Sequence, residues 1–258
     1  MIAHIHKFRD KLDSGQLCLG TGISFTDPAV TESLCASVDF FWIDLEHSPI
    51  GLESLMAHLI AARAGGTPAL VRVPSNEIAW VKRVLDIGAE GVILPRAKSA
   101  EEVRNFVSAC RYPPMGTRSY GPRRPSNYGR NSGTEYREDA NRNLFVTSQI
   151  ETASALEEVE EIARIEGLDS LAIGPYDLSG EMGIMGEVRH PRVTGAIERI
   201  ARVAREAGRY VGIGMGGDVD YATTAAELGV QWIQCGSDSE YSRRFAENLF
   251  ARVRERVS

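Results

Sequence analysis

Three polar residues follow two apolar runs of the chain in a pattern that suits metal binding. Gln149 and Glu151 end the run LFVTSQIE, and Asp177 comes shortly after the next run, LDSLAIG. If the runs are neighbouring strands, the two carboxylates can hold a hard divalent ion and leave its other positions to water and a chelating substrate. Each acid is also placed to cap a helix or turn, Glu151 before Thr152 and Asp177 before Leu178. Two acids at strand ends, with Gln149 pointing the same way, favour the metal site.

A histidine and an arginine lie at two further runs. His47 follows DFFWID in a turn with two acids, where a histidine suits proton transfer near neutral pH. Arg72 interrupts the apolar run ALVRVP, so its charge needs a partner, either an anion in the site or a buried ion pair with Glu46 or Asp44. A turn histidine alone is usually a surface residue. The surrounding charged groups favour a catalytic role for His47.

Lysine usage bears on how such a site would stabilise electrons. The lysines are Lys7, Lys11, Lys82 and Lys98, and none is predicted to lie within a strand. A Schiff-base mechanism needs a desolvated lysine amine in the site, and only Lys98, just past the fourth run, comes near it. A metal ion is therefore favoured over an iminium as the electron sink.

The elements that must position these residues repeat as a short β-rich run followed by an amphipathic segment of helical length. Eight such units in about 250 residues are typical of a single (β/α)8 TIM barrel, whose active sites lie at the carboxyl ends of the strands. An open doubly wound sheet is the alternative, but the early turn GTGISF lacks the third glycine of a dinucleotide fingerprint. The predicted strands are 18–23, 39–44, 68–73, 91–96, 144–151, 168–174, 210–215 and 231–236.

Two segments depart from this repeat. Residues 111–143 are rich in Gly, Pro, Arg and Tyr and have no hydrophobic period, which predicts a long loop after strand four that is functional or lies at an interface. Residues 240–257 predict a last amphipathic helix with Phe245, Leu249 and Val253 on one stripe. This helix packs either on its own barrel or on a neighbouring subunit.

Composition narrows the class of function. The chain has 258 residues, 43% of them hydrophobic, enough for one domain over residues 1–258. Its 29 Lys and Arg against 35 Asp and Glu give a net charge of −6, which argues against nucleic-acid or membrane binding and favours a small-molecule partner. We expect a cytoplasmic protein, since no signal peptide or membrane span is apparent. The dispersed cysteines indicate neither zinc nor disulfides: Cys18, Cys35, Cys110 and Cys235.

Five segments in order resemble the HpcH/HpaI family of metal-dependent class II pyruvate aldolases, which includes 4-hydroxy-2-oxo-heptane-1,7-dioate aldolases. They are WIDLEHSPI, VRVPSNE, KRVLDIGAEGVILPR, QIET and AIGPYDLSGEMGIMGEVRHP, and the resemblance spans about residues 14–250. It implies reversible retro-aldol cleavage of a 4-hydroxy-2-oxo acid to pyruvate and an aldehyde, in aromatic or sugar-acid catabolism. It also implies a divalent metal, Mg²⁺, Mn²⁺ or Co²⁺, and no organic cofactor.

The resemblance further implies a role for each site residue. Glu151 and Asp177 match the metal-binding carboxylates, and the 2-oxo acid would chelate the same ion. Arg72 matches the arginine that stabilises the forming enolate, and His47 matches the base that acts on the C4 hydroxyl through water. Asp86 matches the acid that pairs with this histidine, although the sequence alone indicates only a helix-end surface residue. The residues expected to hold the substrate are Arg72, Gln149, Gly174, Pro175, Tyr176 and Asp177.

Two other functions stay open at this stage. A lyase of the citryl-CoA or malyl-CoA type would use similar carboxylates, but no basic groove for an adenine nucleotide is apparent, and QIET with GPYDLS fits the aldolases better. A barrel that binds oxo acids without catalysis is the other, and it is disfavoured because one chain carries His47, Arg72, Glu151 and Asp177 together.

The chain also departs from the family pattern. Tyr176 stands where a small residue is common. The long loop carries arginines that would suit a distal carboxylate, sugar hydroxyls or a subunit interface, or that simply lie in a solvated loop. The family resemblance implies a homo-trimer or homo-hexamer with the last helix on a neighbouring subunit. The arginines of the loop are Arg118, Arg123, Arg124 and Arg130.

Overall fold

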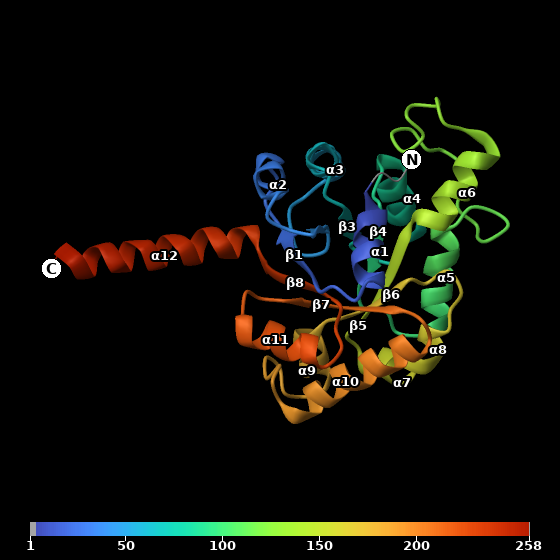
Figure 1. Cartoon of the computed structure of the whole chain (residues 1–258). Coiled ribbons are helices and arrows are strands. Elements are labelled where there is room, and N and C mark those ends of the chain that lie inside the picture. The colour runs from blue at the N-terminus through green and yellow to red at the C-terminus, as the bar shows by residue number, and fades with distance from the viewer. Residues whose placement is uncertain (1–3, 258) are drawn as a thin grey trace.

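Eight parallel strands close into a barrel in chain order, with β8 pairing back to β1 (Figure 1). The computed structural model describes residues 4–257. The predicted (β/α)8 barrel is confirmed, and each predicted strand overlaps an observed one. The strands are β1 (Cys18–Ile23), β2 (Phe40–Asp44), β3 (Ala69–Arg72), β4 (Gly91–Leu94), β5 (Phe145–Ile150), β6 (Ser170–Ile173), β7 (Tyr210–Met215) and β8 (Trp232–Ser237).

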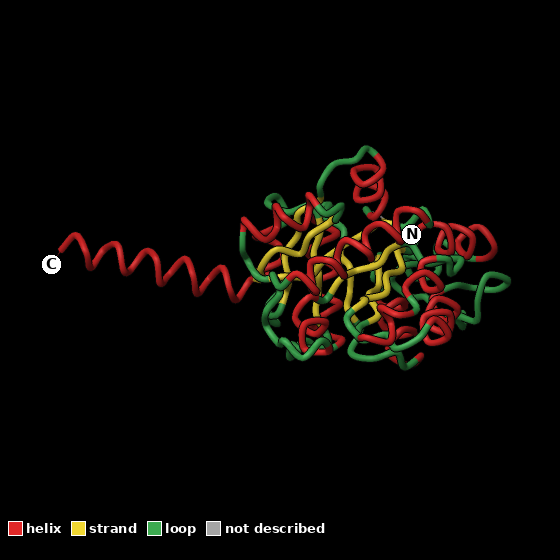
Figure 2. The backbone as a smooth tube through the Cα atoms, turned by 90° about the horizontal axis from the view of Figure 1, so that it is seen from below, coloured by secondary structure: helices red, strands yellow, loops and turns green. Residues whose placement is uncertain are grey.

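A helix follows every strand, and the helices other than α12 lie around the barrel (Figures 1 and 2). Several begin at residues that satisfy free backbone N–H groups; the Ser99 side chain accepts from Glu102 N, and Asp218 from Tyr221 N. The helices are α1 (Ile5–Asp13), α2 (Ala29–Leu34), α3 (Leu52–Gly65), α4 (Ile78–Ile87), α5 (Ala100–Cys110), α6 (Gly133–Asn143), α7 (Ala153–Glu157), α8 (Val159–Ala163), α9 (Pro175–Glu181), α10 (Pro191–Glu206), α11 (Val219–Glu227) and α12 (Asp238–Val257).

The amino end of the barrel is filled by aromatic side chains and covered by α1. Phe40, Phe145 and Trp232 are the first residues of their strands or next to them, and all are fully buried. Phe8 of α1 packs on these rings, with its centroid 5.1 Å from that of Phe40 and 5.4 Å from that of Phe145. Because this end is closed, access to the barrel interior is from the carboxyl ends of the strands.

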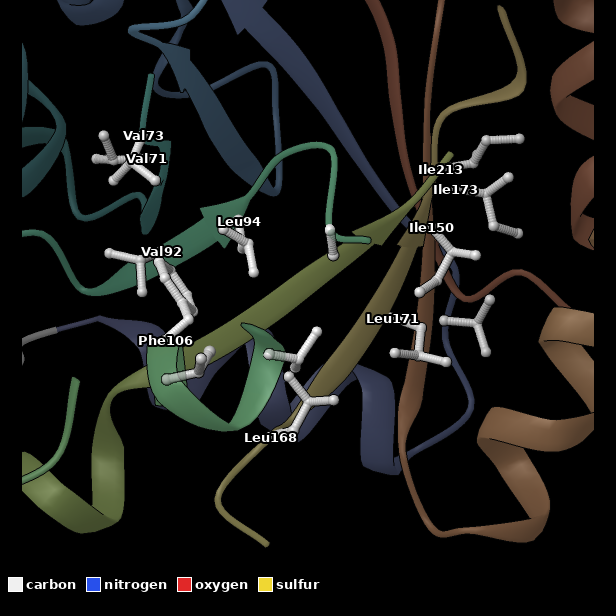
Figure 3. Packing of buried hydrophobic residues seen from close by; sticks show 14 of the residues in the cluster. Val71, Val73, Val92, Leu94, Phe106, Ile150, Leu168, Leu171, Ile173 and Ile213 are labelled. Carbon is white, nitrogen blue, oxygen red and sulfur yellow. The ribbon is translucent and has the colours of Figure 1, made fainter. Parts of the chain in front are cut away.

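The other face of each strand packs against the helices. Strand residues alternate between the two sides, so the residues between the inward ones point outward. Figure 3 shows this outer layer, in which Val92 and Leu94 of β4 lie near Phe106 of α5. Two cores, one inside and one outside the barrel, therefore fix the position of every strand end.

The long segment after β4 differs from the predicted loop because its last third is helical. Helix α6 buries Tyr136, Ala140 and Asn141 on one face, a stripe too polar to show as a hydrophobic period. The Asn141 side chain accepts from Tyr112 N at 2.7 Å and donates to Tyr112 O at 2.9 Å. Arg111 donates to Asp169 Oδ2 at 3.0 Å, just before β6. These contacts hold the segment against the amino end of the barrel.

Helix α12 projects away from the barrel as a single rod (Figures 1 and 2). The predicted stripe is exposed, with 72% of Phe245, 44% of Leu249 and 51% of Val253 accessible. The alternative in which this helix packs on its own barrel is therefore wrong for most of its length. Among residues 4–257, no helix combines the length and apolar composition needed to cross a lipid bilayer.

Candidate active site

A cavity of about 230 Å³ opens at the carboxyl ends of the strands. Barrel enzymes place their active sites at this end. Glycines at inward positions of β7 and just after β6, Gly214 and Gly174, leave room for a ligand. The lining residues are Trp42, His47, Arg72, Gln149, Gly174, Pro175, Tyr176, Asp177, Gly214, Met215, Gly216 and Gln234.

Glu151 lies directly after β5 and is almost fully buried. Its Oε1 accepts from the backbone N–H of Arg96 at 2.7 Å, and its Oε2 accepts from Gln149 Nε2 at 2.6 Å. Burial raises the pKa of Glu151 to about 7, opposed by the Arg96 N–H and reinforced by the carboxylate of Asp177. A carboxylate in this setting is stabilised by a nearby cation.

Asp177 lies in the first turn of α9, which begins right after β6. Strands β5 and β6 are hydrogen-bonded neighbours, so the two predicted carboxylates come from adjacent strand ends. Asp177 is half-exposed, and its Oδ1 accepts from Arg96 Nη1 at 3.1 Å. The alternative helix-cap role does not describe Glu151, because Thr152 caps α7 through Ala155 N.

Arg72, at the end of β3, forms a nearly buried network with two acids of β2 and its turn. Its Nε and Nη2 donate to Asp44 Oδ1 and Oδ2 at 3.0 and 2.7 Å, and its Nη1 lies 3.2 Å from Glu46 Oε2. Burial disfavours the Asp44 carboxylate, yet the Arg72 guanidinium outweighs it and holds the pKa of Asp44 below its usual value. The buried ion pair left open by the sequence is thus present, and Arg72 still lines the cavity.

His47 stands at the mouth of the cavity with 63% of its side chain exposed. Its Nε2 lies 3.5 Å from Glu46 Oε2, which links it to the Arg72 network. Asp86 lies elsewhere, in the last turn of α4, where Arg118 Nη2 donates to its Oδ1 at 3.0 Å. Because α4 ends beside the start of β4, Asp86 and His47 of one chain lie at opposite ends of the barrel, and this expected pair is not formed within the chain.

The residues expected to hold the substrate converge on the cavity. Gln149 is buried, and its Oε1 has no hydrogen-bond partner among residues 4–257. Gly174 and Pro175 form a close wall, and a Cβ at position 174 would lie 2.1 Å from Glu151 Oε2. Tyr176 is 55% exposed, so it borders the opening rather than filling the interior.

None of the four loop arginines is among the residues that line this cavity. Arg118 is committed to Asp86, and Arg124 donates to the backbone carbonyls of Leu59 and Ile87. Their partners belong to α3 and α4. A grip on the substrate's distal group is therefore not supported for Arg118 or Arg124 within one chain.

Sequence reasoning missed several residues of the site. Trp42 and Gln234 were not singled out. Each lies two residues after an inward-facing aromatic residue of a correctly predicted strand, Phe40 and Trp232, so period-two alternation could have found both. Arg72 stacks over Trp42, with its guanidinium carbon 5.5 Å from the ring centroid. Arg96 was also missed, although it is the last residue of the predicted strand 91–96, where a charged side chain at the carboxyl end of a barrel strand is a candidate for the site.

The donor set fits a hard divalent ion. Among residues 4–257, no three His, Cys, Asp or Glu side chains gather as a ligand set, so the chain offers the two carboxylates of Glu151 and Asp177. The unpartnered Gln149 Oε1 and the close glycine wall leave an oxygen-rich recess beside them. Mg²⁺ and Mn²⁺ commonly bind through one or two carboxylates plus water and substrate oxygens.

A small recess with convergent charges at the mouth of a (β/α)8 barrel defines the class of protein, a barrel enzyme for a small molecule. The model of the HpcH/HpaI aldolase/citrate lyase family matches residues 24–244. The chain is 34% identical to 4-hydroxy-2-oxo-heptane-1,7-dioate aldolase of Salmonella dublin, over 95% of this chain and 93% of that protein. It is 33% identical to hydroxypyruvate/pyruvate aldolase of Pseudomonas aeruginosa, over 97% and 93%.

Solved structures agree. An HpcH/HpaI aldolase from Desulfitobacterium hafniense DCB-2 superposes with a TM-score of 0.88 and 30% identity, covering 96% of each chain. A citrate lyase beta subunit from M. tuberculosis shares 20% identity at a TM-score of 0.53, covering 86% and 93%, which shows a common fold alone. The chain belongs to the HpcH/HpaI aldolase/citrate lyase family. It is a class II aldolase, a carbon–carbon lyase.

Proposed function

We propose that the enzyme reversibly cleaves a 4-hydroxy-2-oxo acid to pyruvate and an aldehyde, with a divalent metal held by Glu151 and Asp177. The observation that carries this proposal is the pair of carboxylates on adjacent strand ends. Asp177 lines the small cavity together with Arg72, and the buried Glu151 lies directly behind Gln149 and Gly174, which also line it. A cavity of about 230 Å³ suits a short oxo acid. The relatives named as aldolases of 4-hydroxy-2-oxo-heptane-1,7-dioate and of pyruvate support the same substrate class.

Glu151 and Asp177 would hold Mg²⁺, Mn²⁺ or Co²⁺, and Gln149 would orient the oxo acid beside them. When bound, the ion supplies a Lewis acid that withdraws electrons from the 2-oxo group. The backbone at Gly174, Pro175 and Tyr176 borders the same recess and would position the pyruvate part.

Arg72 and His47 would carry the charge and proton movements. Breaking the C3–C4 bond leaves an electron pair on the pyruvate part, and the Arg72 guanidinium is held by Asp44 and Glu46 to face that developing charge. His47 would accept the proton of the C4 hydroxyl, through water, as the aldehyde forms, and the enolate would become pyruvate when its C3 takes up a proton from water in the open cavity. Its exposure gives the departing aldehyde and the proton a path to solvent.

Asp86 can pair with His47 only from a second copy of the chain, because the two residues lie at opposite ends of one barrel. This agrees with assembly as a homo-trimer or homo-hexamer, which we propose for the protein. The exposed stripe Phe245, Leu249 and Val253 on α12 supports such assembly, since a row of large apolar side chains exposed on a helix usually marks a protein–protein contact. A hollow of about 820 Å³ between α12 and the barrel lies beside this stripe.

We also propose that residues 1–258 act as one aldolase domain, of which residues 1–3 and 258 lie outside the described part. A cytoplasmic location is proposed because the four cysteines are free thiols, two of them, Cys18 and Cys110, buried.

The CoA-type lyase is less favoured. The relatives named as aldolases are 33–34% identical to nearly the whole chain, whereas the citrate lyase subunit is 20% identical. A non-catalytic barrel is disfavoured because Asp44 and Glu46 fix the Arg72 guanidinium beside the cavity that His47 and Asp177 also line.

The test is pyruvate release from a 4-hydroxy-2-oxo acid by the purified protein, with and without chelator. We expect release that a chelator abolishes and that Mn²⁺ or Mg²⁺ restores. Full activity in excess chelator would contradict the metal, and inactivity on a broad oxo-acid panel with cleavage of a 3-hydroxy-acyl-CoA would favour the lyase. Glu151→Gln, which keeps size but removes charge, is the matched variant and should lose both metal and turnover.

A further inference from the structure

Arg96 contacts both carboxylates of the proposed metal site through two different groups. Its backbone N–H donates to Glu151 Oε1 at 2.7 Å, and its guanidinium Nη1 donates to Asp177 Oδ1 at 3.1 Å. The residue comes just after β4, following Pro95, and β4 is the strand that pairs with β5. One residue thus contacts both proposed metal ligands.

The backbone of Arg96 is in the left-handed region, with φ of +46°. A long side chain seldom adopts this conformation, and such strain persists where the surrounding structure requires it. Here the conformation aims the N–H at the buried Glu151 carboxylate and sends the side chain toward the half-exposed Asp177. The two contacts can therefore be separated, because a substitution at position 96 removes the guanidinium but keeps the N–H.

A second acid lies within reach of the same guanidinium. Glu181 Oε1 is 3.7 Å from Arg96 Nη2, one helical turn beyond Asp177 on α9. Glu181 is 37% exposed and Arg96 46% exposed, so the side chain can shift between the two acids without burying a charge. Glu181 offers an ion-pair partner when Asp177 has another cation.

We propose that the Arg96 side chain is a resident counter-cation of the metal site, which a divalent ion displaces from Asp177 toward Glu181. Arg96 is then a positioning residue that sets metal affinity, an inference that rests on the proposed function. A divalent ion binds Asp177 more strongly than the Arg96 guanidinium does, because the ion carries twice the charge and binds Glu151 as well. The displaced guanidinium stays near the ion and lowers its affinity by repulsion.

The sign of the effect separates this role from a structural one. If Arg96 only supported the fold of the site, its removal would weaken metal binding. If it competes with the metal, removal strengthens binding. Exposed ion pairs and screened repulsions are weak, so the expected gain is about threefold to tenfold at low ionic strength.

The experiment is titration of the metal-stripped protein with Mn²⁺, followed by electron paramagnetic resonance of the free ion and by calorimetry. Arg96→Ala should bind Mn²⁺ about threefold to tenfold tighter, and the gain should shrink in about 0.5 M salt as the Debye length falls. Arg96→Asn, neutral and tolerant of the left-handed backbone, should behave alike. Arg96→Lys, which keeps the charge, should stay within about twofold of the wild type.

Controls separate the possible failures. Arg104→Ala removes another exposed arginine, paired with Glu161 on the outer helices, and should leave Mn²⁺ affinity unchanged. Unchanged or weaker binding in both Arg96→Ala and Arg96→Asn overturns the role of Arg96. A wild-type protein that shows no Mn²⁺ site sensitive to Glu151→Gln overturns the proposed function instead.

Discussion

Gly174→Ala is a small substitution that should remove metal binding while leaving the fold in place. An added Cβ would lie 2.1 Å from Glu151 Oε2, 2.7 Å from Gln149 Nε2 and 2.8 Å from Glu151 Cβ. Ordinary contacts of a Cβ begin near 3.4 Å, so the carboxylate must retreat by more than 1 Å. The backbone itself tolerates alanine, since Gly174 has φ of −105°.

The cost follows from what Glu151 would lose. It is buried, and a shift of that size breaks its hydrogen bonds to Arg96 N and Gln149 Nε2. Misplacing a catalytic group by about 1 Å can cost about 10²-fold, and overpacking of this kind costs about 1–3 kcal/mol of stability. We therefore expect Mn²⁺ affinity and pyruvate release each to fall at least about 10²-fold in a protein that still folds.

The assay combines Mn²⁺ titration, pyruvate release and circular dichroism. Gly195→Ala is the matched control, because a Cβ there meets no atom within 4 Å and alanine suits the interior of α10. It should keep wild-type binding and be slightly more stable. A folded Gly174→Ala protein with wild-type Mn²⁺ affinity would refute the close contact between Gly174 and Glu151.

Three further predictions concern the neighbouring groups. His47→Ala should keep Mn²⁺ affinity and lose turnover by about 10²- to 10⁴-fold, the usual range for a general base, and wild-type rates would remove His47 from the mechanism. Asp44→Asn should lower the free energy of unfolding by about 2 kcal/mol in urea, because it removes the charge that pairs with Arg72 Nε and Nη2 and leaves this nearly buried guanidinium to Glu46; an unchanged free energy of unfolding would contradict the network. Mn²⁺ affinity should fall about tenfold per pH unit below pH 7 and level off above it. The reason is that burial raises the pKa of Glu151 to about 7, so below this pH a proton competes with the ion for the carboxylate. A flat affinity profile from about pH 5.5 to 8 would contradict this.

The barrel was predictable because its strands are short, apolar and separated by amphipathic segments. The same regularity put Glu151 and Asp177 on adjacent strand ends, since parallel strands in chain order present their carboxyl ends at one face. Trp42 and Gln234 follow from the same alternation once it is applied to every strand.

The rest depends on tertiary contacts that no local pattern encodes. The partner of Asp86 is Arg118, from a segment without hydrophobic period, so the acid could be placed at a helix end but not paired. Helix α6 escaped prediction because its buried face includes Asn141, held by Tyr112 rather than by apolar burial alone. Arg96 owes its role to a left-handed backbone, and arginine gives no signal for that conformation.

The most direct test of the central claim is a crystal structure of the enzyme with Mn²⁺ and pyruvate or oxalate, with the ion located by anomalous scattering. Oxygens of Glu151 and Asp177 should both lie about 2.1 Å from the ion, with the oxo acid completing the coordination. An ion bound elsewhere, or a ligand bound with those two carboxylates pointing apart, would contradict the proposed site.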